Sequence, residues 1–179
     1  MAVFLVLTVL GEDRPGLVES LSQVIAAHDG NWLESRMSRL AGKFAGILRA
    51  SVPESEIEAL TDTLRELESQ DLKLLIEWSA NDEPAQAYQI LKFDLIGNDR
   101  VGIIHDISQA LATHGVNIDE LNTDYLSAPM SGEMLFKASA LIRVPLEVAV
   151  ADLQTHLEHI AHDLMVDVAL EVVSATASV

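Results

Sequence analysis

The chain has 179 residues, and its 28 acidic and 11 basic side chains give a net charge of −17. It contains no cysteine, which excludes a disulfide scaffold, a thiolate zinc site and a cysteine nucleophile. Apolar residues make up 49% of the chain, which excludes an intrinsically disordered protein, and the negative charge argues against direct binding of nucleic acid. The length predicts one or two domains.

The chain opens with Val3–Leu10, a near-continuous run of apolar and β-branched residues that predicts a buried strand. No basic residue precedes this run and no small-residue cleavage site follows it, so we do not expect a signal peptide. The run is also shorter than the roughly 20 residues that a membrane span needs. We therefore expect a cytoplasmic protein that makes no contact with a membrane.

Helical spacing of apolar residues then predicts a helix over Gly16–His28. A hairpin follows, with strands at Asn31–Leu40 and Lys43–Val52 joined by a turn at Ala41-Gly42. Pro53 ends the second of these strands, because proline fits a helix start but not a strand interior.

A second helix is predicted to begin at a capping box formed by Ser55 and Glu58. The acidic run Glu54–Glu68 is expected to form an exposed face of this helix, although such a face could also dock a basic partner. Alternating apolar residues from Leu72 to Trp78 predict one more strand.

The second half of the chain repeats the first. Shifting the sequence by 86 residues aligns Gly11–Glu34 with Gly97–Glu120, and 10 of these 24 pairs are identical. The repeat predicts a strand at Tyr88–Ile96, a helix at Gly102–His114 and a final strand at Met165–Val173. Residues 1–84 carry a net charge of −8 and residues 85–179 a net charge of −9, so both halves are acidic.

Each half therefore has the order strand, helix, strand, strand, helix, strand, which predicts an α+β fold. This βαββαβ order gives a ferredoxin-like unit, an antiparallel four-stranded sheet with both helices on one face. We expect domains at residues 1–80 and 88–179, joined by a linker at residues 81–87. Each core is modest at this size, so pairing of the two halves or formation of a homodimer is plausible.

The same motif follows the first strand of both halves: Gly11-Glu12-Asp13-Arg14-Pro15-Gly16, and Gly97-Asn98-Asp99-Arg100-Val101-Gly102. An asparagine opens the next strand, Asn31 in the first half and Asn117 in the second. This pattern resembles the ACT domain, a small regulatory module that senses amino acids, and the resemblance covers almost the whole chain. It departs from the usual pattern at Val101, where proline is common, and at Trp32, a bulky residue that could narrow a nearby cavity.

The resemblance implies an amino-acid site at the loop between first strand and first helix. The helix start offers unpaired backbone N–H groups for a carboxylate, and aspartate can accept from an ammonium group. The candidate ligand-binding residues are Gly11, Asp13, Arg14, Gly16, Asn31, Asn98, Asp99, Arg100, Gly102 and Asn117. The alternative is that these residues serve only the fold, with aspartate as a helix cap and glycine as a turn residue. Arg14 and Arg100 could instead pair with acidic surface or with a partner.

The histidines favour structural roles. The spacing of His156, His159 and His162 fans around a helix, so we expect a solvated face rather than a metal site. His28 and His114 fall at equivalent helix ends, where a protonated ring would complement the helix dipole.

We therefore expect a non-enzymatic regulator with neither cofactor nor metal. The resemblance implies a tandem ACT protein that binds a small amino acid, glycine as first choice. It also implies a protein partner, a DNA-binding activator of glycine-cleavage genes. The alternative is the regulatory subunit of an amino-acid biosynthetic enzyme.

Overall fold

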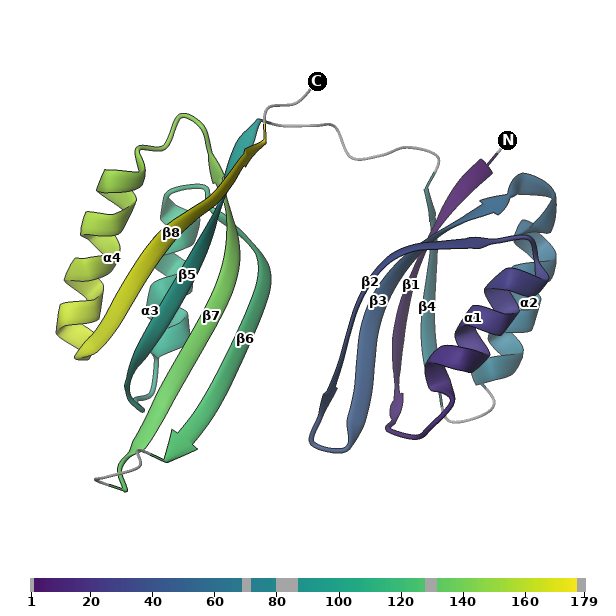
Figure 1. Cartoon of the computed structure of the whole chain (residues 1–179), viewed down its shortest axis with the longest axis horizontal. Helices are drawn as coiled ribbons and strands as arrows, with labels where there is room; N and C mark the ends of the chain where they lie inside the picture. The colour runs from purple at the N-terminus through teal and green to yellow at the C-terminus, as the bar shows by residue number, and fades with distance from the viewer. Residues whose placement is uncertain (1, 69–71, 80–86, 128–131, 177–179) are drawn as a thin grey trace. The chain divides into compact units, whose positions relative to one another are not determined.

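A computed structural model of the chain describes residues 2–68, 72–79, 87–127 and 132–176. The chain divides into two compact units, Met1–Glu83 and Pro84–Val179. The predicted linker, residues 81–87, lies outside the described residues except for Ala87. Each unit is described by itself below (Figure 1).

The first unit follows the predicted order of elements. Its elements are β1 (Ala2–Glu12), α1 (Leu17–Ala27), β2 (Asn31–Leu40), β3 (Lys43–Pro53), the short 3₁₀ helix η1 (Glu54–Glu56), α2 (Ile57–Glu68) and β4 (Leu72–Ser79). The second unit repeats this order, without an equivalent of η1 among its described residues. Its elements are β5 (Tyr88–Asn98), α3 (Ile103–Thr113), β6 (Asn117–Ser127), β7 (Met134–Pro145), α4 (Val150–Leu164) and β8 (Val166–Thr176).

Each unit contains one four-stranded sheet, in the order β2-β3-β1-β4 and β6-β7-β5-β8. Every pairing is antiparallel, and both helices of a unit cover the same face of its sheet (Figure 1). The prediction of two ferredoxin-like βαββαβ units is therefore confirmed. None of the described helices is long and apolar enough to cross a membrane.

The core of each unit lies between the sheet and its helices. Alternate residues of β1 point into it, namely Leu5, Leu7 and Val9, and the buried leucines of α2, Leu60 and Leu64, cover them. The second core is built in the same way from β5, α3 and α4. Successive side chains of a strand point to opposite faces of the sheet, so the helices bury every second residue of the central strands.

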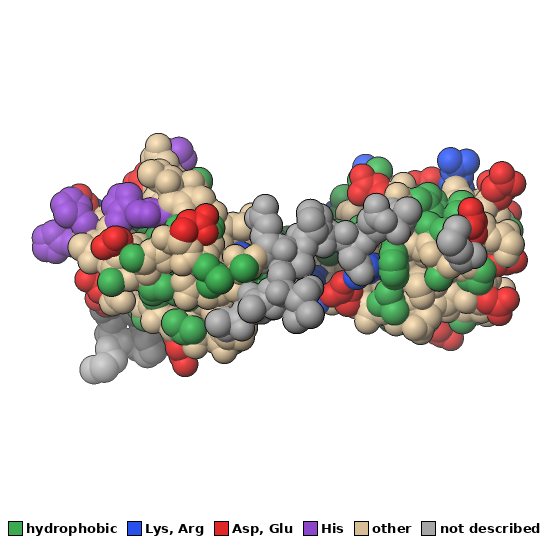
Figure 2. Space-filling model, turned by 90° about the horizontal axis from the view of Figure 1, so that it is seen from above, with side chains coloured by type: hydrophobic (Ala, Val, Ile, Leu, Met, Phe, Trp, Pro, Cys, Tyr) green, Lys and Arg blue, Asp and Glu red, His purple; other side chains and the backbone are tan. Residues whose placement is uncertain are grey.

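The outer face of each sheet carries apolar and charged side chains together. In the first unit Leu10, Ile47 and Leu75 are exposed there, and the guanidinium carbon of Arg49 lies 4.2 Å from the ring centroid of Phe4. Figure 2 shows acidic side chains over the surface of both units and histidine side chains gathered on the second.

Two local predictions are wrong. Ser55 lies inside η1, and α2 begins only at Ile57, so Ser55 and Glu58 do not form the expected capping box. The first strand of each unit also runs further than the expected Val3–Leu10 and Tyr88–Ile96, so Gly11 lies within β1 and Asn98 is the last residue of β5. Gly11 is buried and pairs with Phe44 in β3 and with Leu72 in β4, and this pairing on both sides continues β1 to Glu12.

Candidate functional site

The first loop with the repeated motif joins β1 to α1, and the β2–β3 hairpin holds it. The backbone N–H of Asp13 donates to the carbonyl oxygen of Gly42 at 3.0 Å. The carboxylate of Asp13 pairs with the guanidinium group of Arg39. One oxygen of Asp13 therefore already has a cationic donor, and a ligand ammonium group would have to share this carboxylate.

The loop ends at Gly16, which is the N-cap residue of α1. Gly16 has a φ of 90°, a left-handed conformation that favours glycine, and no side chain caps the helix start. A Cβ atom at Gly16 would have only one neighbour within 4 Å, Glu19 Oε2 at 3.9 Å, so there is room beside the backbone. The first N–H groups of α1 can therefore meet a small anion, although Glu19 in the first turn adds a negative charge nearby.

The second loop joins β5 to α3 and has the same form. The backbone N–H of Asp99 donates to the carbonyl oxygen of Met134 at 3.2 Å, and Gly102 caps α3 with a φ of 98°. Arg100 Nη2 lies 3.8 Å from Met165 Sδ. Arg100 is thus directed toward the β8 side of the unit rather than toward an acidic surface.

The two units differ at the hairpin position whose side chain pairs with Asp13 in the first unit. Arg39 lies opposite Phe44 in the first hairpin, and Tyr125 takes the matching position opposite Phe136 in the second. Tyr125 is exposed and carries no positive charge. No sequence motif marks Arg39 or Tyr125, and the register of the hairpin is the signal that identifies both positions.

Asn31 and Asn117 do not join these loops within one unit. Asn31 opens β2 opposite Ser51, at the level of Phe4 in β1, eight residues before Glu12. At about 3.3 Å per residue this separates Asn31 from the loop by about 26 Å. Asn117 is displaced in the same way, and its amide donates to Asp119 Oδ1 at 2.9 Å. A small ligand therefore cannot touch both the asparagine and the aspartate of the same unit.

The histidines at the helix ends are C-cap residues whose side chains bond to neighbouring helices. His28 is the C-cap residue of α1, but its Nδ1 lies 3.0 Å from Glu56 Oε2 and its Nε2 lies 3.1 Å from Thr63 Oγ1. Thr63 already donates its hydroxyl proton to the carbonyl oxygen of Ala59. The His28 side chain therefore links α1 to η1 and α2.

The equivalent His114 has a different partner. Its Nε2 lies 2.9 Å from Nδ1 of His156, and the two rings meet edge to face. The prediction of a solvated face is therefore right for His159 and His162, which are exposed, and wrong for His156. Among the residues that the structure describes, no group of three or more suitable side chains could hold a metal ion.

The clearest pKa shifts lie on the outer sheet face, away from both loops. Lys92 Nζ lies 2.8 Å from Asp94 Oδ2. The hydrogen bond from Lys92 lowers the pKa of the Asp94 carboxyl, and the same bond raises the pKa of Lys92. This ion pair lies within β5 on the outer face of the sheet and is not part of either loop.

Comparison with known proteins supports the fold. A family model described as the ACT domain matches residues 3–79. A protein of unknown function from Galdieria sulphuraria has a TM-score of 0.86 and 27% identity, covering 97% of this chain and 100% of that one. A structure provisionally named as a glycine cleavage system transcriptional repressor has a TM-score of 0.72 and 19% identity, covering 97% and 99%. No protein with a curated description matches the sequence.

The family match spans nearly all of the first unit, and the second unit repeats its element order, its sheet order and its glycine-capped helix start. The first unit therefore matches the ACT-domain family, and the second unit has the same fold.

Proposed function

We propose that this chain is a non-enzymatic regulator that responds to a small amino acid, with glycine as the first choice. The observation that carries the proposal is the repeated loop, in which an uncapped, glycine-started helix follows an aspartate in both units. The ligand carboxylate accepts from the first N–H groups of the helix, and its ammonium group donates to Asp13 or Asp99.

The second loop is proposed as the stronger of the two sites. The carboxylate of Asp13 is already paired with Arg39, so a ligand ammonium group there meets a partly neutralised acceptor. Asp99 is exposed, and the position matching Arg39 holds the uncharged Tyr125. Asn31 and Asn117 are not part of the ligand site proposed at the loop of their own unit.

The output of the regulator is proposed to be protein contact, with a DNA-binding activator of glycine-cleavage genes as the partner. The likeness to the structure provisionally named as a glycine cleavage system transcriptional repressor supports this choice. The net charge of −17 favours an indirect route to DNA, because a chain so acidic repels phosphates. Glycine would act by binding one arrangement of the protein better than another and so shifting the affinity for the partner.

Calorimetry of the full chain with a panel of amino acids, glycine first, tests the ligand. We expect binding heat with the wild type, a clear loss in Asp99→Ala and a smaller loss in Asp13→Ala. A control variant, Asp62→Ala with Glu158→Ala, removes two charges from exposed helix faces and should bind as the wild type does. Absence of heat with every amino acid at high protein concentration would refute the sensor.

Affinity capture from cell extract tests the partner. We expect recovery of a DNA-binding protein in an amount that glycine changes. Recovery of the catalytic chain of a biosynthetic enzyme would overturn the co-repressor proposal and favour a regulatory subunit instead.

A further inference from the structure

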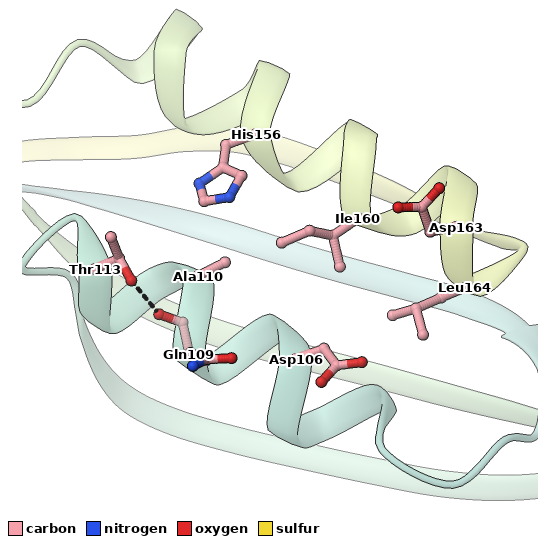
Figure 3. Close-up of a pocket in the computed structure, with 8 residues that line it drawn as sticks. All are labelled: Asp106, Gln109, Ala110, Thr113, His156, Ile160, Asp163 and Leu164. Atoms are coloured by element: carbon pink, nitrogen blue, oxygen red, sulfur yellow. Dashed lines mark hydrogen bonds between the residues drawn. The ribbon is translucent and has the colours of Figure 1, made fainter.

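A groove in the second unit lies between α3 and α4 and belongs to neither loop (Figure 3). Its volume is about 320 Å³, within the range of pockets that hold small molecules. The lining residues are Asp106, Gln109, Ala110, Thr113, His156, Ile160, Asp163 and Leu164. The groove is therefore open to a small ligand and is lined by both polar and apolar groups.

The two ends of the groove carry different polar groups. Asp106 in the first turn of α3 and Asp163 near the end of α4 lie toward one end, and Thr113 and His156 lie toward the other (Figure 3). The negative end of the α4 dipole and the positive end of the α3 dipole offset each other there, so the negative charge comes from the two carboxylates, and Asp163 Oδ2 also lies 3.6 Å from His159 Nδ1. Ile160 points into the groove between the ends. A ligand that fits must be cationic at one end and apolar in the middle.

The other end of the groove offers acceptors as well. Thr113 donates its hydroxyl proton to the carbonyl oxygen of Gln109 at 2.9 Å, so its oxygen can only accept from a ligand. One ring nitrogen of His156 is bonded to His114, which leaves the other for the groove. Asp106 and Thr113 are seven residues apart on one helix, a rise of about 10 Å. Acceptors at both ends with this separation suit a linear molecule with a donor at each end.

Three residues of the groove lining differ from their counterparts in the first unit. The first unit has Ser20 in place of Asp106, Val24 in place of Ala110 and, counting from the buried leucines of α2 and α4, Thr63 in place of His156. These exchanges remove a carboxylate, a histidine and the space that a small residue leaves. The lining of this groove is therefore not shared by the two copies of the repeat.

We propose that this groove binds a linear aliphatic diamine, with one ammonium group between the carboxylates of Asp106 and Asp163. The second ammonium group donates to Thr113 and His156, and the carbon chain lies along Ala110 and Ile160. An α-amino acid does not fit, because its carboxylate is adjacent to its ammonium group and would face the two aspartates. The site is separate from the amino-acid loops of the proposed function.

Titration of the full chain with pentane-1,5-diamine, followed by calorimetry and by amide chemical shifts at about 0.15 M salt, tests the proposal, because this salt screens loose counter-ion binding. We expect shifts along α3 and α4. Asp106→Asn and Asp163→Asn should each weaken binding about tenfold, through loss of one charge-assisted bond. Glu158→Gln removes one charge from an exposed position of α4 and should bind as the wild type does. Ala110→Val, which copies Val24, should block the groove without a change of charge.

Three results would overturn the proposal. They are unchanged affinity in both aspartate variants, an equal loss in Glu158→Gln, or equal shifts with the neutral pentan-1-ol. Two variants distinguish this site from the loops. Asp163→Asn should respond to glycine as the wild type does, and Asp99→Ala should respond to the diamine as the wild type does. Since the aspartate variants change surface groups, they test the site even if Ala110→Val does not fold.

Discussion

Gly97 lies at the start of the second repeated motif, and the structure gives it a packing role that can be tested. It pairs with Val166 across β5 and β8. A Cβ atom at Gly97 would lie 2.6 Å from Val166 Cγ1 and 2.8 Å from Val166 Cα, where carbon atoms normally stay about 3.5–4.0 Å apart. The contact involves backbone, so Gly97→Ala must displace the strand. We expect a cost of about 1–3 kcal/mol, the usual range for overpacking.

The distribution of aromatic residues allows each unit to be followed in the intact chain. Both tryptophans, Trp32 and Trp78, lie in the first unit, and both tyrosines lie in the second. A cost of 2 kcal/mol should lower the melting temperature of the second unit by about 8–16 °C. Circular dichroism should record this shift, whereas the tryptophan fluorescence transition should not move.

Gly102→Ala is the matched comparison for Gly97→Ala. Gly102 has a φ of 98° but free space around it, since the nearest atom to its Cβ would be Asp106 Oδ2 at 3.8 Å. Gly102→Ala should lower the unfolding free energy by about 1–2 kcal/mol, through backbone conformation alone. A melting temperature of Gly97→Ala equal to that of the wild type, or a shift in the tryptophan signal, would refute the reasoning.

Two further predictions concern the hydrogen-bonded side chains. His28→Ala removes two contacts at a side chain that is 16% exposed and should lower the unfolding free energy of the first unit by about 1–3 kcal/mol, whereas an unchanged urea midpoint of the tryptophan signal would contradict the bridge. Because Lys92 lowers the pKa of Asp94, this carboxylate stabilises the fold above its ordinary pKa and loses that contribution as the pH falls through the lowered value. Asp94→Asn should therefore flatten the acid limb of the circular dichroism melting profile, and an unchanged limb would contradict the pairing.

The fold was predictable because every signal for it is local or periodic. Near-continuous apolar runs marked the central strands β1 and β5, helical spacing marked the helices, and the repeat predicted the same element order twice. Strand ends were less predictable. Gly11 reads as a loop residue from its neighbours, but β1 continues through it because β3 and β4 pair with it on both sides.

The candidate site was predictable only in part. The motif located the glycine-capped starts of α1 and α3, since those residues are adjacent in sequence. The partner of Asp13 and the distance of Asn31 depend on sheet register, which pairs residues far apart in the chain. The groove between α3 and α4 gave no sequence signal, because its lining is spread over two helices more than 40 residues apart and contains no recognised motif.

The two units keep one histidine position but give it different partners. His28 lies 3.0 Å from Glu56 Oε2 and 3.1 Å from Thr63 Oγ1, whereas His114 lies 2.9 Å from His156 Nδ1. Thr63 and His156 take matching positions of α2 and α4, and the buried leucines around them hold both cores alike. The helix pairs of one repeated scaffold therefore differ in hydrogen bonding and in charge, and these differences lie at the groove for which a ligand is proposed in the second unit.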